Sequence, residues 1–253
     1  MSGFIVEKFW HLNNYRYIFY RFLVEKYCKQ SFSKKSSLML DAGCGSRICS
    51  LSHVPKNVFV IGLDVRRKNI LNSRRKANEK GYKNFSFIVA SITSLPFRHD
   101  TFALTVCVDV LEHLLNKQKA VAEISRVCKL GAKLVGSTTN FLNPVCLFDS
   151  LAPKRVIEIL TERFAPGHYE RHSRFSPAKL MQTLKHSNFQ ALSVKLLGFP
   201  LFPTWLYQFS KKKIPWYAYL WIIFNKLTEK KPLNFLKETI VFHAIKKDYS
   251  KGW

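Results

Sequence analysis

Short apolar runs of strand length alternate along the chain with longer segments in which apolar residues recur at helical spacing. Helical spacing marks residues 4–32, 66–80, 111–130 and 176–187. Gly81 and Gly131 are expected to end the second and third of these helices, and Ser176 to cap the fourth before Pro177. Strands are expected at residues 38–40, 58–63, 85–90, 102–108, 132–137, 190–197 and 239–246. This alternation predicts an α/β protein with a seven-stranded, mostly parallel sheet sandwiched by helices.

Three stretches that break this pattern indicate the domain organisation. Residues 1–37 are interpreted as an N-terminal helical cap that ends in a polar, basic linker. Residues 38–253 are interpreted as one domain with two insertions. The first insertion, at about 139–175, is rich in proline and polar residues, and the second, at about 198–235, is rich in aromatic residues and lysine.

Composition narrows the class of partner without choosing one. The 253 residues include 41 Lys and Arg against 16 Asp and Glu, a formal net charge of +25. Such a field favours nucleic acid, anionic lipid or acidic small molecules. Six cysteines without a CxxC pair or zinc-finger spacing indicate free thiols in a reducing cytosol, and no metal site is expected.

Neither a signal peptide nor a transmembrane helix is predicted. Charged residues interrupt the apolar positions at the N-terminus, which a signal peptide would not tolerate. The longest apolar run, residues 214–224, has about half of the ~20 residues that a membrane span needs. The expected location is the cytoplasm, with attachment to the inner face of the membrane as a further hypothesis.

The stretch that points to chemistry is Leu-Met-Leu-Asp-Ala-Gly-Cys-Gly-Ser at residues 38–46. A buried strand runs into Gly43 and Gly45, which let a ligand approach the backbone closely. The next strand ends in Asp64, which can accept hydrogen bonds from the two hydroxyls of a ribose. Asp41 would repel a pyrophosphate and attract an ammonium group. Neither the dinucleotide-binding G-x-G-x-x-G nor a P-loop is present.

The order of several motifs resembles the class I S-adenosylmethionine-dependent methyltransferases, specifically the small-molecule branch that includes the quinone-biosynthesis type and the type 11 domain. The segment LMLDAGCGS is similar to the first motif of that branch, and VIGLDV to the second. The long segment FIVASITSLPFRHDTFALTVCVDVLEHL resembles the third and fourth motifs together. The resemblance covers about residues 38–138 and 170–197, with a weaker match at 239–246, and it implies a Rossmann-like fold.

The resemblance implies S-adenosyl-L-methionine as the cofactor and assigns residues to its parts. The expected contacts are Asp41, Gly43 and Gly45 for the methionine side, Asp64 for the ribose, Val65, Ser91 and Ile92 for the adenine, and Val108 and Asp109 for the wall after the fourth strand. Two positions depart from the branch. Ser91 stands where an aspartate is usual, and Arg47 replaces a third glycine. A non-catalytic protein that binds the cofactor is therefore one alternative.

Methyl transfer needs a base only if the accepting atom carries a proton at neutral pH. His113 and His172 are the candidate catalytic bases, and Glu112, Arg174 and Tyr15 are candidate substrate contacts. An alternative reading is that Glu112 and His113 anchor the start of a helix. The segment around His172 and Arg174 is equally interpretable as a hinge held by hydrogen bonds.

The aromatic and basic insertion at residues 198–235 has three interpretations. It is a lobe that covers the substrate, a surface that meets anionic lipid, or a platform on which bases stack. The resulting hypothesis is methyl transfer to an oxygen or nitrogen atom of a small-molecule or lipid-linked acceptor at a membrane surface. The alternative partner is nucleic acid, in an RNA methyltransferase. The sequence predicts no oligomeric state.

Overall fold

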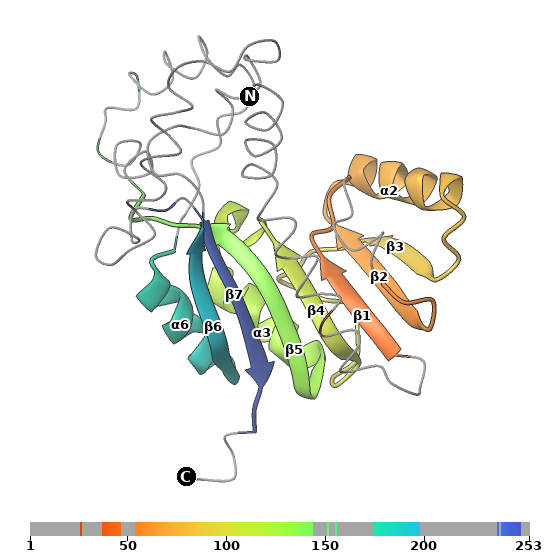
Figure 1. The fold of residues 1–253 in the computed structure, drawn as a ribbon. Helices are drawn as coiled ribbons and strands as arrows, with labels where there is room; N and C mark the ends of the chain where they lie inside the picture. Colours follow the sequence, from red (N-terminus) through yellow and green to blue (C-terminus); the bar gives the residue numbers. More distant parts are fainter. Residues whose placement is uncertain are drawn as a thin grey trace, which may run out of the picture.

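The structure is a computed structural model, and it describes residues 26, 37–46, 54–143, 151, 155, 175–197, 237 and 239–248. Seven strands form one sheet in the order β3-β2-β1-β4-β5-β7-β6 (Figure 1). Their bounds are β1 Ser37–Ala42, β2 Val58–Asp64, β3 Phe85–Val89, β4 Phe102–Val108, β5 Cys128–Thr139, β6 Phe189–Leu197 and β7 Thr239–Lys246. The pairings from β3 to β5 are parallel, and β7 runs antiparallel to β5 and β6. The predicted seven-stranded, mostly parallel sheet is confirmed.

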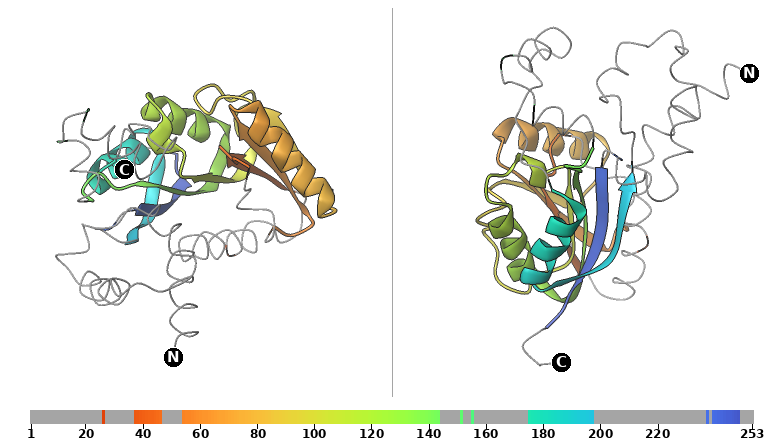
Figure 2. Two further views of the ribbon diagram at one scale, coloured as in Figure 1. Left: turned by 90° about the horizontal axis from the view of Figure 1, so that it is seen from above. Right: turned by 90° about the vertical axis from the view of Figure 1, so that its left-hand side faces the viewer.

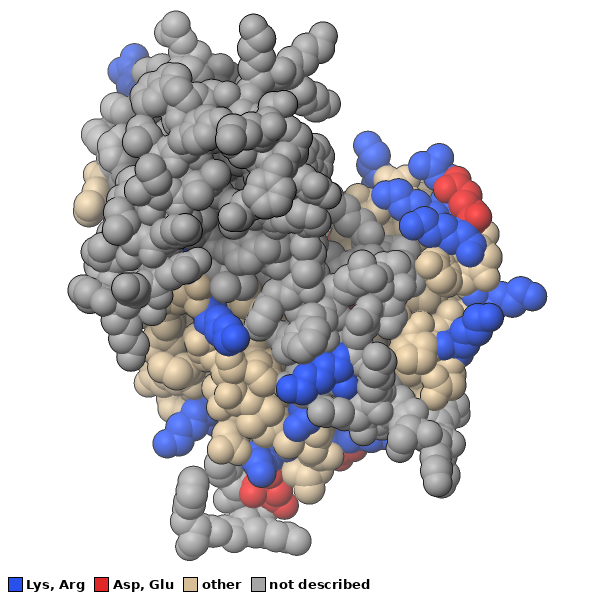
Figure 3. Space-filling view, viewed as in Figure 1, with Lys and Arg blue, Asp and Glu red and all other residues tan. Residues whose placement is uncertain are grey.

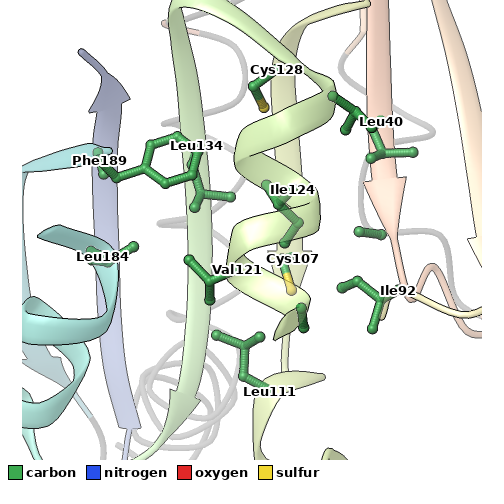
Figure 4. Close-up of a cluster of buried hydrophobic side chains, with 14 of the residues drawn as sticks. Leu40, Ile92, Cys107, Leu111, Val121, Ile124, Cys128, Leu134, Leu184 and Phe189 are labelled. Carbon is green, nitrogen blue, oxygen red and sulfur yellow. The ribbon is translucent and has the colours of Figure 1, made fainter. Parts of the chain in front are cut away.

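Helices α3 (Lys117–Val127) and α6 (Pro177–His186) cover one face of this sheet (Figures 1 and 2). Val121 and Ile124 of α3 and Leu184 of α6 pack with Leu134 and Phe189 from the strands (Figure 4). All five side chains are buried. Each such burial stabilises the fold by about 1.5–3 kcal/mol, so this contact between helices and sheet supplies much of the core.

Helix α2 (Arg67–Glu79) packs on the opposite face, against β2 and β3. Its buried residues Ile70 and Ala77 contact Phe87 and Cys44. Because successive residues of a strand point to opposite faces, Phe87 faces α2 whereas Ile88 joins the core under α3. The strands are therefore buried from both sides, which explains their nearly continuous apolar sequences.

The predicted helix at residues 111–130 is wrong at both ends. Leu111–His113 form a single turn of 3-10 helix, η1, and α3 begins only at Lys117. The side chain of Asn116 accepts a hydrogen bond from the Lys119 backbone N–H (2.9 Å), which caps the helix at that point. The last residues of the predicted helix instead begin β5, where Cys128 pairs with Phe102.

The other described elements follow the prediction closely. Ser176 accepts a hydrogen bond from the Lys179 backbone N–H at the start of α6 (3.3 Å), with Pro177 in the first turn. Gly81 follows α2 with a φ of +68°. The predicted N-terminal helix and most of the two predicted insertions lie outside the described residues.

Candidate functional site

The candidate site lies at the carboxyl-terminal edge of the sheet, where the strand order changes direction. β1 pairs with β2 on one side and with β4 on the other, so the connections leave β1 towards opposite edges of the sheet. In open α/β sheets, ligands bind outside the carboxyl ends of strands at such a point. The predicted residues Asp41, Asp64 and Asp109 stand at or just after the ends of β1, β2 and β4.

The turn after β1 contains two glycines with positive φ, +78° at Gly43 and +56° at Gly45. The backbone N–H groups of Gly43 and Cys44 both donate to the Leu63 carbonyl at 2.8 Å, which ties the turn to β2. A Cβ at Gly43 would lie 2.4 Å from Cγ2 of Val110, but a Cβ at Gly45 would meet none of the described residues within 4 Å. Gly43 therefore serves packing inside the protein, whereas no described residue fills the space beside Gly45.

The Asp64 carboxylate is held by three N–H donors. Oδ2 accepts from the Gly45 backbone N–H at 3.1 Å. Oδ1 accepts from the Arg66 backbone N–H at 2.8 Å and from the Asn69 side-chain amide at 3.1 Å. These bonds join the glycine turn, the end of β2 and the start of α2 around one carboxylate.

The three predicted adenine contacts differ in exposure. Val65 is 69% exposed, directly after Asp64, whereas Ile92 is buried in the main core (Figure 4). Ser91 is half-buried, and its hydroxyl bonds Thr93 Oγ1 at 2.8 Å and accepts from the Thr93 backbone N–H at 3.2 Å. The contacts with Thr93 therefore fix the orientation of the Ser91 hydroxyl.

Asp109 follows β4 with a positive φ of +53°, a backbone conformation that is strained for a residue with a side chain. Ser137 near the end of β5 holds it: the Ser137 hydroxyl donates to Asp109 Oδ1 at 2.6 Å and accepts from the Asp109 backbone N–H at 3.1 Å. Val108, just before it, is half-buried. The strain marks this bend as a candidate functional position.

Glu112 and His113 are neighbours in η1 with opposite environments. Glu112 is buried, and His113 is exposed. The Thr139 hydroxyl donates to Glu112 Oε1 at 3.2 Å, whereas Oε2 has no hydrogen-bond partner among the described residues. Burial, and then the charge of Asp109, raise the pKa of the Glu112 carboxyl to about 7.

Three carboxyl groups act on one buried thiol, that of Cys107 in β4. Burial raises the pKa of Cys107, and Glu112, Asp41 and Asp109 raise it further. The thiol therefore stays protonated and is no nucleophile. Asp41, Asp109 and Glu112 therefore form a group of carboxyl residues around Cys107, in a chain whose net charge is +25.

Three predicted site residues lie outside the described residues: Tyr15, His172 and Arg174. Arg47 lies outside them as well. Within the described ranges, no three His, Cys, Asp or Glu side chains gather closely enough to hold a metal ion. The described helices also include none with the length and apolarity of a membrane span.

Comparison with known proteins gives the family. Residues 33–188, more than half of the chain, match the family described as "Methyltransferase domain". The chain belongs to this family. The methyltransferase is 26% identical over 176 residues to "Ubiquinone biosynthesis O-methyltransferase" of Vibrio atlanticus (strain LGP32), covering 69% of this chain and 71% of that relative.

Solved structures confirm the fold of the methyltransferase. The YcgJ protein of Bacillus subtilis superposes with a TM-score of 0.57 at 19% identity, covering 89% of this chain and 98% of that one. Geranyl diphosphate C-methyltransferase of Streptomyces coelicolor A3(2) has a TM-score of 0.59 at 13% identity, covering 88% of this chain and 78% of that one. The family, the sheet order and the glycine turn make this chain a class I methyltransferase that depends on S-adenosylmethionine.

Sequence reasoning missed the residues that hold the site in place. Asn69 in α2 donates a hydrogen bond to Asp64. Val110, just after β4, packs against Gly43. Ser137 in β5 holds Asp109, 28 positions away in the chain. One signal was available: the Ser-Thr-Thr run that starts at Ser137 closes the fifth strand with three hydroxyl groups. Three hydroxyl side chains in a row are unusual in a buried strand. At the strand end where ligands bind, they indicate that polar groups nearby need hydrogen-bond partners.

Proposed function

We propose that this methyltransferase transfers the methyl group of S-adenosylmethionine to an oxygen or nitrogen atom of a small-molecule or lipid-linked acceptor at a membrane surface. One observation supports this proposal most: the glycine turn and four carboxyl groups lie together where the strand order reverses. The four carboxyl groups are those of Asp41, Asp64, Asp109 and Glu112. Carboxylates attract the ammonium and sulfonium groups of this cofactor, so the residues present fit it.

The contacts proposed for the cofactor follow the edge of the sheet from β1 outwards. The methionine part lies against Asp41, Gly43 and Gly45, the ribose against Asp64, the adenine against Val65, Ser91 and Ile92, and the far wall is Val108 with Asp109. Val65 supports this assignment because it leaves a large apolar surface exposed beside Asp64.

Asp64 is proposed to accept one ribose hydrogen bond without rearrangement. A carboxylate offers about four lone-pair positions, and three N–H groups already occupy three of them. The remaining position is on Oδ2, which accepts from Gly45 alone among the described residues. A second ribose hydroxyl would take the place of the Asn69 amide on Oδ1.

The bound cofactor supplies a methyl group on a good sulfonium leaving group, so the protein needs mainly to align the acceptor and exclude water. His113 is proposed as the base where the acceptor atom carries a proton, because it is exposed shortly after the end of β4. His172 is the second proposed base. Glu112, Arg174 and Tyr15 are proposed to face the acceptor.

Two observations support the acceptor and its location. The relative from Vibrio atlanticus is by name an O-methyltransferase of ubiquinone biosynthesis, which supports an oxygen acceptor on a small molecule. Lys and Arg side chains gather over α2, which carries Arg67, Lys68, Arg74, Arg75 and Lys76 (Figure 3). Basic surface residues contribute on the order of 1 kcal/mol each near anionic lipid, which supports a membrane surface.

Transfer of radiolabelled methyl from S-adenosylmethionine tests the acceptor. The acceptors compared are hydroxylated aromatic compounds with and without a prenyl tail, their amine analogues, and purified RNA. Transfer to a tailed phenol or aniline supports the proposal, and transfer to RNA alone overturns it. Asp64→Asn is expected to lose activity, while Asp100→Asn, which removes the same charge from an exposed residue before β4, keeps it.

Co-sedimentation tests the membrane surface separately. Vesicles of phosphatidylcholine with and without about one quarter anionic phospholipid are compared at low and high salt. Binding to the anionic vesicles alone, which weakens with salt, is expected. Absence of binding at low salt removes the membrane from the proposal and leaves the methyl transfer intact.

A further inference from the structure

Glu112 is a buried carboxyl group whose hydrogen-bonding capacity is only half used. The residue is 5% exposed, and Thr139 satisfies Oε1, while Oε2 has no partner among the described residues. The Thr138 hydroxyl, fully buried near the end of β5, lies close enough to lower the pKa of Glu112. The Thr138 hydroxyl also has no hydrogen-bond partner among the described residues. Unsatisfied buried polar atoms are rare in native proteins, and they point to a bound group or to a functional state.

Among the described residues, the charges that face Glu112 are mostly negative. Asp109, directly after β4, is the charged group that raises the pKa of Glu112 most, and Asp41 at the end of β1 acts with both on the same buried thiol. His113 lies next to Glu112 in η1 and is exposed. The ammonium of Lys117 in α3 lies over the ring of Phe175, 4.7 Å from the ring centre. Among the described residues, hydrogen bonds and no basic side chain lower the pKa of Glu112 against the effect of Asp109.

We infer that Glu112 distinguishes the cationic cofactor from its product, because the buried oxygen Oε2, which has no partner among the described residues, is compensated by the sulfonium charge of the cofactor and not by the neutral sulfur of the product. The inference rests on the proposed placement of the cofactor. S-adenosylmethionine carries a sulfonium, whereas the sulfur of S-adenosylhomocysteine is neutral after the methyl group has left. The two ligands are otherwise alike in charge, so the sulfur decides their difference.

The direction of the pH effect follows from the protonation of Glu112. Below neutral pH the free protein holds this carboxyl neutral, because burial and Asp109 raise its pKa to about 7. A cation at the edge favours the ionised form, so binding of S-adenosylmethionine releases a proton from Glu112 to solvent. Affinity for the cation then increases as pH rises towards about 7 and levels off above it. Affinity for the product depends less on pH, because the product brings to this edge only the ammonium group that both ligands share.

The measurement is the ratio of the dissociation constants of S-adenosylhomocysteine and S-adenosylmethionine, by calorimetric titration of the full chain. A unit charge within about 10 Å of another, at an effective dielectric constant of about 20, changes a binding constant by at least about tenfold. The ratio is therefore expected to rise about tenfold between about pH 5 and about pH 8. Titrations in buffers of different ionisation enthalpy are expected to show more proton release with S-adenosylmethionine than with S-adenosylhomocysteine.

Two variants and one control complete the experiment. Glu112→Gln keeps an oxygen for the Thr139 hydroxyl and is expected to make the ratio independent of pH. Thr139→Val removes the donor to Glu112 and is expected to move the rise to higher pH, which keeps the inference testable if the first variant does not fold. Asp100→Asn removes one charge before the other end of β4 and is expected to leave the pH profile unchanged.

The outcomes separate this inference from the proposed placement of the cofactor. A ratio that does not change with pH in the wild-type protein, or that rises equally in Glu112→Gln, overturns the role of Glu112. Failure of the wild-type protein to bind either ligand overturns the placement and this inference with it. Methyl transfer to an unexpected acceptor affects neither.

Discussion

Gly43 and Gly131 form a matched pair that separates backbone strain from steric overlap. Their φ angles are nearly equal, +78° and +77°. A Cβ at Gly43 would lie 2.4 Å from one methyl group of Val110 and 2.9 Å from the other, whereas a Cβ at Gly131 would meet no described residue within 4 Å. Substitution of each by alanine therefore adds the same strain and differs only in the contact with Val110.

The magnitudes follow from these two terms. A residue with a Cβ in the left-handed region costs about 1–2 kcal/mol, which is the whole effect expected for Gly131→Ala. Overpacking against Val110 adds about 1–3 kcal/mol, so Gly43→Ala is expected to lower the free energy of unfolding by about 2–5 kcal/mol. Such a loss is a large part of the roughly 5–15 kcal/mol that is typical of folded domains.

Urea denaturation of the wild-type protein and of both variants measures the difference. Gly43→Ala with Val110→Ala serves as the further control, because the shorter side chain relieves the overlap and should recover part of the loss. Equal destabilisation by Gly43→Ala and Gly131→Ala would refute the reasoning, since the overlap with Val110 would then contribute nothing.

Three further predictions concern the cofactor and pH. Gly45→Ala is expected to lower the free energy of unfolding by only about 1–2 kcal/mol. It is also expected to weaken S-adenosylmethionine binding at least about tenfold in calorimetry, because the added Cβ would enter the space proposed for the ligand. Unchanged affinity would place the ligand elsewhere. Asp64→Asn is expected to weaken cofactor binding by about 1.5–3 kcal/mol, and titration with adenosine alone should show the same loss. The pKa of Glu123 is lowered to about 2, first by its hydrogen bond with Arg126, so Glu123→Gln should destabilise the protein at neutral pH. This difference should shrink as pH falls from about 4.5 to about 2, and a constant difference in acid would contradict it.

The sequence predicted candidate residues along the whole ligand edge of the sheet, but not the contacts that hold the residues after β4. The glycine turn and Asp64 were predictable because the strand that precedes each ends abruptly in a polar residue. The environment of Glu112 was not predictable, because its burial depends on β5 and its partner Thr139 is 27 positions away in the chain. The same holds for Asp109, whose bend is held by Ser137.

Local pattern by itself determined which segments became strands, since a short apolar run bounded by turn residues fits a sheet that is buried on both faces. It also determined the capped start of α6, because Ser176 and Pro177 act within one turn of helix. Tertiary structure decided where the helix after β4 ends, because Cys128 pairs with Phe102 across the sheet and so starts β5 instead of extending the helix. It also decided the charge state of the site: a carboxyl group has an ordinary pKa in an isolated chain, and only burial beside another carboxylate raises it.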